Sequence, residues 1–149
     1  HGRDFESGRK AFAAAACFKC HRLAGEGGIV GPDLTGVGRR FSIKDLLESL
    51  IEPSKVISDQ YRATVFVLDN GKTVVGRVGN LSRERLMIVT NMLAPGEFAR
   101  VNRSSVDQML PSDVSQMPDN LLDGLSREEI LNLIAYLRSG GDLNDPAFQ

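Results

Sequence analysis

The chain has 149 residues, of which 42% are hydrophobic and 25% charged, and its formal net charge is -1 at pH 7. These values are ordinary for one globular domain, or for one domain with a sizeable insertion. Lys and Arg are scattered, so nothing indicates a nucleic-acid interface, and no apolar run approaches the ~20 residues that cross a bilayer. The sequence opens on His1 and Gly2 rather than on methionine. We therefore expect either a processed protein or an excised domain.

The first third of the chain is predicted to hold two helices joined by a loop. Residues 4–16 place apolar side chains at spacings of three and four, the period of a helix with one buried face. Residues 25–38 are rich in glycine and contain a proline, so they are expected to form a loop. Ser42 is a good N-cap residue, and the second helix is expected to run from there to Pro53, which stops it.

The periodicity changes after about residue 60. β-Branched and aromatic residues become frequent, and Asn70-Gly71 is a strong signal for a hairpin turn. Pro95-Gly96 marks another turn. Strands are predicted over residues 61–68, 72–78, 85–90 and 97–101. This stretch is expected to form a small antiparallel sheet or a partial barrel.

Helical signals return near the end of the chain. Ser126 and Glu129 form a capping box, in which each side chain can bond the backbone amide of the other residue. An apolar stripe at helical spacing follows, and Gly140-Gly141 is expected to end the helix. Both ends of the last helix are therefore marked in the sequence.

One short motif carries chemistry. The chain has two cysteines, and residues 17–21 read Cys-Phe-Lys-Cys-His. This CxxCH spacing is typical of covalent c-type haem attachment, because Cys17 and Cys20 can each add to a haem vinyl group and the imidazole of His21 then lies beneath the iron. Three other interpretations stay open here. They are a thioredoxin-like pair, which needs a βαβ context that is not visible, a zinc site that would have to recruit His1, and a chance occurrence.

The chain resembles monohaem cytochromes c with one His and one Met axial ligand, and this resemblance assigns further roles. In that family a glycine and an aromatic residue of the first helix cross a leucine and an aromatic residue of the last helix. Gly8 and Phe12 match the first pair, and Leu133 and Tyr136 match the second. A glycine lets two helices approach closely because it has no side chain. Ordinary helix amphipathicity is the alternative explanation of either pair.

The loop of residues 31–36, Gly-Pro-Asp-Leu-Thr-Gly, resembles the Gly-Pro-x-Leu-x-Gly loop of the same family. The resemblance implies that the Pro32 carbonyl accepts the Nδ1 proton of His21, which orients the imidazole and raises its basicity. It also implies that Leu34 packs against the haem. A simple turn is the alternative, since Gly-Pro is common in turns.

The resemblance also implies a methionine ligand on the opposite face of the haem, and the chain has four candidates. Met117 precedes Pro118 shortly before the last helix, where the family ligand is usually a Met-Pro pair. Met87 falls in a predicted strand and Met92 beside a predicted turn, and a strand methionine is more often core filler. Met109 and an open or water-bound iron are the remaining alternatives. A thioether ligand favours Fe(II), raises the reduction potential and closes the coordination sphere.

Two arginines complete the expected site. Arg39 or Arg40 could reach a haem propionate, since a guanidinium pairs well with a carboxylate, and a solvated loop charge is the equally open alternative. Tyr61 is another possible propionate partner. The residues expected to bind the one covalent haem c are Cys17, Cys20, His21, Pro32, Leu34, Arg39, Arg40 and Met117, with His21 and Met117 on the iron.

More narrowly, the chain resembles the haem-binding cytochrome c domain of many planctomycete proteins, which also has a Pro-Ser-Lys stretch, here residues 53–55. The resemblance implies a mainly α cytochrome c fold of three or four helices around a haem. That domain would comprise residues 1–58 and 109–149, with a β-rich insertion at residues 59–108. The insertion could cover a haem edge, present a docking surface or only decorate the fold. One departure from better-known cytochromes is that Phe12 lies five residues before Cys17 rather than about four, so the resemblance does not fix the helix register around the haem.

The expected function is single-electron transfer by an electron carrier rather than an enzyme, serving a redox protein partner or a fused dehydrogenase domain. The resemblance implies the latter, because such domains often follow β-propeller, dehydrogenase-like domains. It also implies a periplasmic or otherwise extracytoplasmic location, where haem c is attached. A haem-based sensor or small-ligand binder, with Met117 labile or absent from the iron, is the alternative. A peroxidase-like haem is disfavoured because only His1 could serve as a distal histidine.

Overall fold

The computed structural model describes residues 2–80 and 82–149, so the roles considered for His1 lie outside the described residues. The chain divides into two compact units, each of which is described by itself. The helical unit contains the chain up to Pro53 together with Asp119–Gln149, and the sheet unit is Ser54–Pro118. The assignment of a haem domain and an insertion to particular residue ranges stays a prediction.

The helical unit is built on helices whose ends are set by local side-chain hydrogen bonds. Asp4 accepts from the Ser7 amide at the start of α1, while Ser42 and Ser126 each form a complete capping box at the start of α4 and α5. Gly140 ends α5 in the left-handed conformation with φ 65°. These starts and stops confirm the predicted ones. The elements are α1 (Phe5–Ala14), α2 (Cys17–Cys20), β1 (Arg22–Leu23), β2 (Glu26–Gly27), α3 (Val37–Arg40), α4 (Ile43–Ile51), α5 (Arg127–Ser139) and η2 (Pro146–Phe148).

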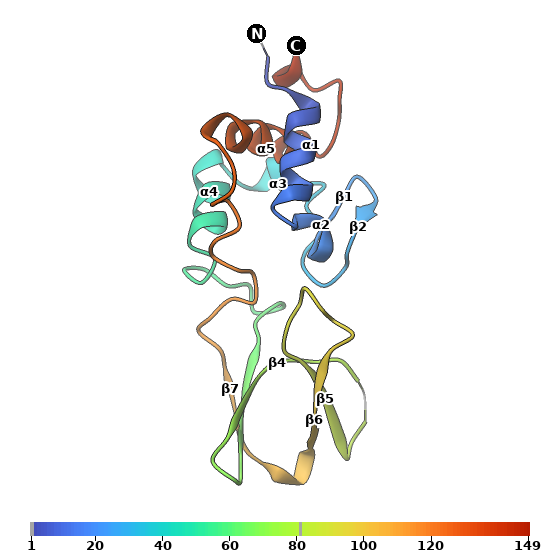
Figure 1. The fold of residues 1–149 in the computed structure, drawn as a ribbon, viewed down its shortest axis with the longest axis vertical. Helices are drawn as coiled ribbons and strands as arrows, with labels where there is room; N and C mark the ends of the chain where they lie inside the picture. Colours follow the sequence, from blue (N-terminus) through green and yellow to red (C-terminus); the bar gives the residue numbers. More distant parts are fainter. Residues whose placement is uncertain (1, 81) are drawn as a thin grey trace. The chain divides into compact units, whose positions relative to one another are not determined.

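The close crossing of α1 and α5 forms the core of the helical unit (Figure 1). A Cβ placed on Gly8 would meet the backbone oxygen of Asn132 and lie 2.8 Å from the Cβ of Tyr136. The rings of Phe12 and Tyr136 contact at a centroid distance of 5.7 Å, and Leu133 is fully buried. The predicted crossing is therefore confirmed, with Gly8 at the point of closest approach.

The sheet unit holds a five-stranded antiparallel sheet in the order β6-β5-β4-β3-β7. Its core cluster consists of Phe66, Leu86, Ile88 and Val101. Gly71, with φ 80°, forms the tight turn between β3 and β4, as the Asn-Gly pair predicts. The elements are β3 (Thr64–Leu68), β4 (Thr73–Val78), β5 (Arg85–Val89), β6 (Phe98–Asn102), η1 (Arg103–Ser105) and β7 (Val106–Pro111).

The expectation of a mainly α fold is wrong. Alongside α1–α5, the described residues form the five-stranded sheet and the two-stranded β1–β2 sheet, so the chain is a mixed α and β protein. Strand β7 was missed because it has no buried face. Val106 is half-buried and all later residues of the strand are exposed, so the sequence of this edge strand shows no alternating hydrophobic pattern. The predicted loop over residues 25–38 is also interrupted, since β2 and the start of α3 fall within it.

Candidate functional site

The CxxCH motif lies on its own short helix, separated from α1 by a sharp break. The helix α1 ends at Ala14, Ala16 adopts the left-handed conformation with φ 59° and ψ 20°, and α2 then begins at Cys17. The predicted helix over residues 4–16 therefore extends two residues too far at its C-terminal end. This break accommodates the extra residue between Phe12 and Cys17, because the chain changes direction before the motif instead of carrying the α1 register into it.

The two cysteines and the histidine are held together by one turn of backbone. Cys17 is buried, Cys20 is half-buried, and both are thiols in the structure. The amide of His21 donates to the Cys17 carbonyl over 2.9 Å, after which the backbone of His21 becomes extended. Burial raises the pKa of Cys17 to about 11 and also raises the pKa of Cys20. Both side chains are consequently protonated at neutral pH.

The imidazole of His21 has a fixed orientation. Its Nδ1 lies 2.7 Å from the Pro32 carbonyl oxygen, which can only accept a hydrogen bond. Burial lowers the pKa of His21, and the hydrogen bond to Pro32 offsets only part of that effect. The ring is therefore neutral at physiological pH with its proton on Nδ1. Its Nε2 lone pair remains for a metal.

The loop after the motif holds the Pro32 carbonyl from both sides. The amide of Gly31 donates to the Cys20 carbonyl, and the amide of Leu34 donates to the Arg22 carbonyl, each over 2.8 Å. A Cβ on Gly31 would lie 2.7 Å from Cε1 and 2.9 Å from Nδ1 of His21. Only a glycine therefore allows the loop backbone to lie this close to the imidazole face.

A second set of hydrogen bonds stiffens the same loop one turn later. The Thr35 hydroxyl donates to the Asp33 carboxylate over 2.6 Å and accepts from the Ala24 amide over 3.0 Å. Hydrogen bonds from the side chain and backbone of Thr35 lower the pKa of Asp33. The Asp33–Thr35 segment is thereby tied to the β1–β2 turn, where Ala24 has φ 52°.

The structure brings only part of the predicted site together. Leu34 is half-buried in the same loop as Pro32, while Arg39 and Arg40 are exposed at the end of α3. The guanidinium of Arg40 lies over the ring of Phe41 at 5.8 Å. Met117 belongs to the sheet unit, in the segment after β7, where its amide donates to the Ser115 hydroxyl over 3.1 Å. The roles of these residues toward a haem stay predictions.

Sequence reasoning missed the residues that position His21 through their backbones. Gly27 and Gly28 indicated only a loop, and Gly31 was noted only as part of the loop that contains Pro32, yet each of the three approaches a backbone or ring atom of the segment Phe18–His21 too closely for a side chain. The amide of Gly28 also donates to the Phe18 carbonyl over 2.8 Å. The density of glycines directly after the CxxCH was the signal that could have identified them.

The donor set suits a covalently held haem better than a bare ion. Within residues 2–80 and 82–149, no group of three or more His, Cys, Asp or Glu side chains could hold a metal ion. Two thiols one helical turn apart, followed by a neutral imidazole with a free Nε2, fit the attachment points and the proximal ligand of a haem c. The residues present therefore fit that group.

Comparison with known proteins agrees with this chemistry. The family model for cytochrome c matches residues 5–67, from α1 to nearly the end of β3. No curated protein matches the chain. The family match supports a c-type cytochrome, an electron-transfer haem protein with covalently bound haem c, of a kind that typically carries electrons rather than catalysing a reaction. In the part of the chain that the structure describes, no helix is both long and apolar enough to span a membrane.

Proposed function

We propose that the chain carries single electrons through one haem c attached at Cys17 and Cys20, with His21 and Met117 as axial ligands. The observation that carries the proposal is the 2.7 Å contact between His21 Nδ1 and the Pro32 carbonyl. It fixes the tautomer and the plane of the imidazole before any iron is bound, as metal-ligating histidines require. When bound, haem c supplies an iron that alternates between Fe(III) and Fe(II), one electron at a time.

The chain's own residues would hold this group and limit its movement. Cys17 and Cys20 would form thioethers on one edge, and Leu34 would pack beside the ring. The rigid Gly31–Leu34 segment keeps His21 in one position. A ligand that moves little when the iron is oxidised or reduced keeps the reorganisation energy small, which supports fast electron exchange. Arg39 or Arg40 would neutralise a propionate, which their exposed positions and flexible side chains permit.

Met117 is the methionine whose setting best suits the second axial position. It precedes Pro118 outside the strands, and the Ser115 hydroxyl holds its amide. Met87 and Met109 lie within β5 and β7, and Met92 is buried. A thioether on the iron favours Fe(II) and closes the coordination sphere, which suits electron transfer and hinders binding of small ligands.

The wider setting of the domain belongs to the same proposal. The ordered set of motifs is similar to that of the planctomycete haem-binding domain, which supports a redox protein partner or a fused dehydrogenase as the source of electrons. Attachment of haem c outside the cytoplasm supports a periplasmic or equivalent location. Encounters with a separate partner would be brief and would bury little surface, as is usual for redox complexes.

The ligand assignment is tested by spectra recorded during a potentiometric titration of wild type, Met117→Ala and Met109→Ala. We expect Met117→Ala to lose the far-red absorption band of a methionine on Fe(III) and to have a lower reduction potential. Met109→Ala, which removes an exposed methionine, should change neither property. Extensive carbon monoxide binding to the reduced wild type at neutral pH would instead favour a sensor with an open or labile position.

Haem attachment is tested separately. After denaturation the wild type should keep its haem, whereas Cys17→Ser and Cys20→Ser should each retain one thioether and show a shifted reduced spectrum. Free release of haem from denatured wild-type protein would contradict the whole proposal.

A further inference from the structure

The outer face of the β5–β6 ribbon in the sheet unit carries two arginines that no role described so far uses. Arg85 is paired with Asn102 across the two strands, and Met87 is paired with Arg100. Because side chains alternate along a strand and directly paired residues share a face, these four side chains project to one side. Leu86 is buried on the opposite side, in the core of the sheet unit.

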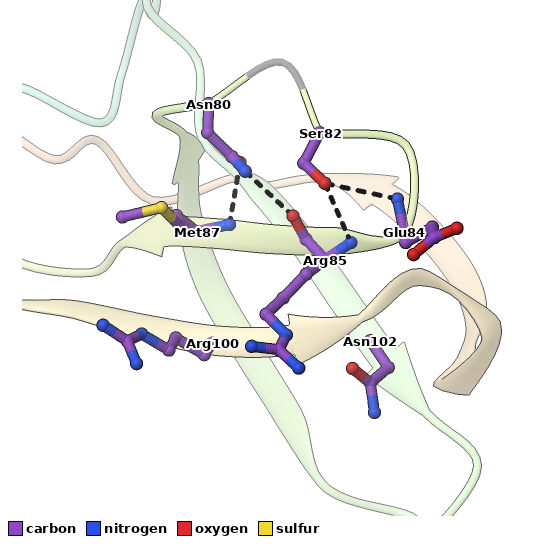
Figure 2. A pocket seen from close by; sticks show the side chains of 7 residues that line it. All are labelled: Asn80, Ser82, Glu84, Arg85, Met87, Arg100 and Asn102. Atoms are coloured by element: carbon purple, nitrogen blue, oxygen red, sulfur yellow. Dashed lines mark hydrogen bonds between the residues drawn. The ribbon is translucent and has the colours of Figure 1, made fainter.

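This face is hollowed rather than flat. A pocket of about 530 Å³ lies over the ribbon. Figure 2 shows the side chains of Arg85, Arg100 and Asn102 alongside β6, with Asn80 and Ser82 contacting β5 from the preceding loop. The volume lies in the range of sites for small organic molecules. The residues that line the pocket are Asn80, Ser82, Glu84, Arg85, Met87, Arg100 and Asn102.

The preceding loop is fastened to the strand that forms the floor of the pocket. The side-chain Nδ2 of Asn80 donates to the Arg85 carbonyl over 2.9 Å, and its Oδ1 accepts from the backbone amide of Met87 over 2.9 Å. The Ser82 hydroxyl oxygen accepts from the amides of Glu84 and Arg85 over 3.4 and 3.3 Å. Since its oxygen is the acceptor in both bonds, the Ser82 hydroxyl proton remains for a further acceptor.

Both arginine side chains lie on the hollowed face of the ribbon, and Arg100 is turned along β6 toward Phe98. Within residues 2–80 and 82–149, neither Arg85 nor Arg100 takes part in an ion pair. Arg100 lies over the Phe98 ring at 5.5 Å, a stacking contact that limits the movement of its guanidinium. Glu84 is the one carboxylate among the lining residues. The segment from Arg77 to Arg103 contains five arginines against two glutamates, so the surrounding field also favours an anion.

We propose that this pocket binds a small oxyanion, a carboxylate or a phosphate, through Arg85 and Arg100, with the Ser82 hydroxyl and the Asn102 amide as further donors. Guanidinium groups match both oxyanions because they offer two parallel N–H bonds to paired oxygen atoms. The site is independent of the electron-carrier function, because it uses no residue assigned to the haem.

The test is calorimetric titration of the haem-loaded protein with inorganic phosphate and, separately, with succinate, at constant ionic strength set by chloride. Saturable binding by wild type is expected, and the tighter of the two probes identifies the oxyanion class. Arg85→Gln and Arg100→Gln should each weaken binding roughly tenfold, the typical effect of one charge-assisted hydrogen bond. Glu84→Gln should tighten it, a change that a merely structural role would not produce.

Arg103→Gln is the matched control. It removes the same charge one residue beyond the pocket lining, from an exposed position. The affinity of Arg103→Gln for the tighter probe should stay within about twofold of wild type, because salt screens the attraction between the probe and an exposed charge that does not contact it. Equal losses in Arg103→Gln and Arg85→Gln, or the absence of saturation at tens of millimolar probe, would overturn the proposal.

Discussion

The helical unit and the sheet unit differ in the internal contacts that most sharply limit substitution within each of them. In the helical unit the backbone approaches neighbouring atoms too closely for a side chain at two glycines, Gly8 against α5 and Gly31 against the His21 ring. The sheet unit depends on a few large buried side chains, above all Phe66 and Ile88. We therefore compare the two units by adding an atom at Gly8 and by removing atoms at Phe66.

The units also differ in charge. The sheet unit has eight Lys and Arg against six Asp and Glu, a net charge of +2, and the remainder has ten against thirteen, a net charge of -3. The net charge of -1 for the whole chain therefore hides a separation of sign. The CxxCH motif lies in the acidic helical unit and the arginine-lined pocket in the basic sheet unit, so the two units attract charged molecules differently.

The largest effect is expected from removing atoms in the sheet unit. Phe66 is fully buried at the centre of the core cluster, so Phe66→Ala should destabilise that unit by about 3–5 kcal/mol through lost burial and a residual cavity. Amide hydrogen exchange measured strand by strand would detect it. Val75→Ala, at an exposed position of β4, should change exchange little. Protection of β3 and β5 that survives Phe66→Ala would show that the core is not organised around this ring.

Adding a single methyl group to the helical unit should have the next largest effect. In Gly8→Ala the new Cβ would meet the Asn132 carbonyl and the Tyr136 Cβ, both of which belong to the packed face of α5. We expect a loss of about 1–3 kcal/mol from overpacking, measured as a lower denaturant midpoint with an unchanged slope. Gly124→Ala adds the same methyl where nothing lies within 4 Å and should leave the midpoint in place. Equal midpoints for the two variants would mean that the helices separate without cost.

The features that sequence reasoning found are those decided within a few residues. The capping box at Ser126, the N-cap at Ser42 and the turn at Gly71 each depend on one or two local hydrogen bonds, and all three stand where they were expected. The Gly8 crossing is a long-range contact and was found only because a family resemblance supplied the partner helix. Caps and turns can therefore be predicted from a single sequence, whereas the helix or strand that a given segment contacts cannot.

The features that were missed depend on contacts between distant segments. β7 pairs with β3 through its backbone and presents almost no buried side chain, so no hydrophobic pattern marks it. The arginine-lined pocket exists only because the β5–β6 register places Arg100 opposite Met87. A shift of one residue would turn Arg100 toward the other face. Register of this kind is decided by the whole sheet and cannot be inferred from either strand alone.

The two thiols of the helical unit should differ in reactivity before haem is attached. With a pKa of about 11, Cys17 has roughly a hundredfold less thiolate at pH 8 than an ordinary thiol, and it is also buried. Iodoacetamide should therefore modify Cys20 first in the haem-free chain, and modification of Cys17 should accelerate as the pH rises toward 11. Trypsin cleaves after Lys19, so mass spectrometry can follow each cysteine in its own peptide. In denaturant the two rates should converge; convergence already in the native chain would contradict the buried position of Cys17.

The smallest predicted effect concerns Ala16, where the chain breaks between α1 and the CxxCH motif on α2. Ala16 has φ 59°, a conformation that costs a residue with a Cβ about 1–2 kcal/mol and glycine almost nothing. After allowing for the greater chain entropy of glycine in the unfolded state, Ala16→Gly should stabilise the helical unit by about 0.5–1 kcal/mol. Ala13→Gly, at an exposed position inside α1, should do the reverse and destabilise it by about 1 kcal/mol. We therefore expect the thermal midpoint to rise for Ala16→Gly and to fall for Ala13→Gly, because Ala16 is in the left-handed conformation and Ala13 is in the helical one. A loss of stability in both variants would mean that α1 continues through Ala16 and that Phe12 and Cys17 share one helical register.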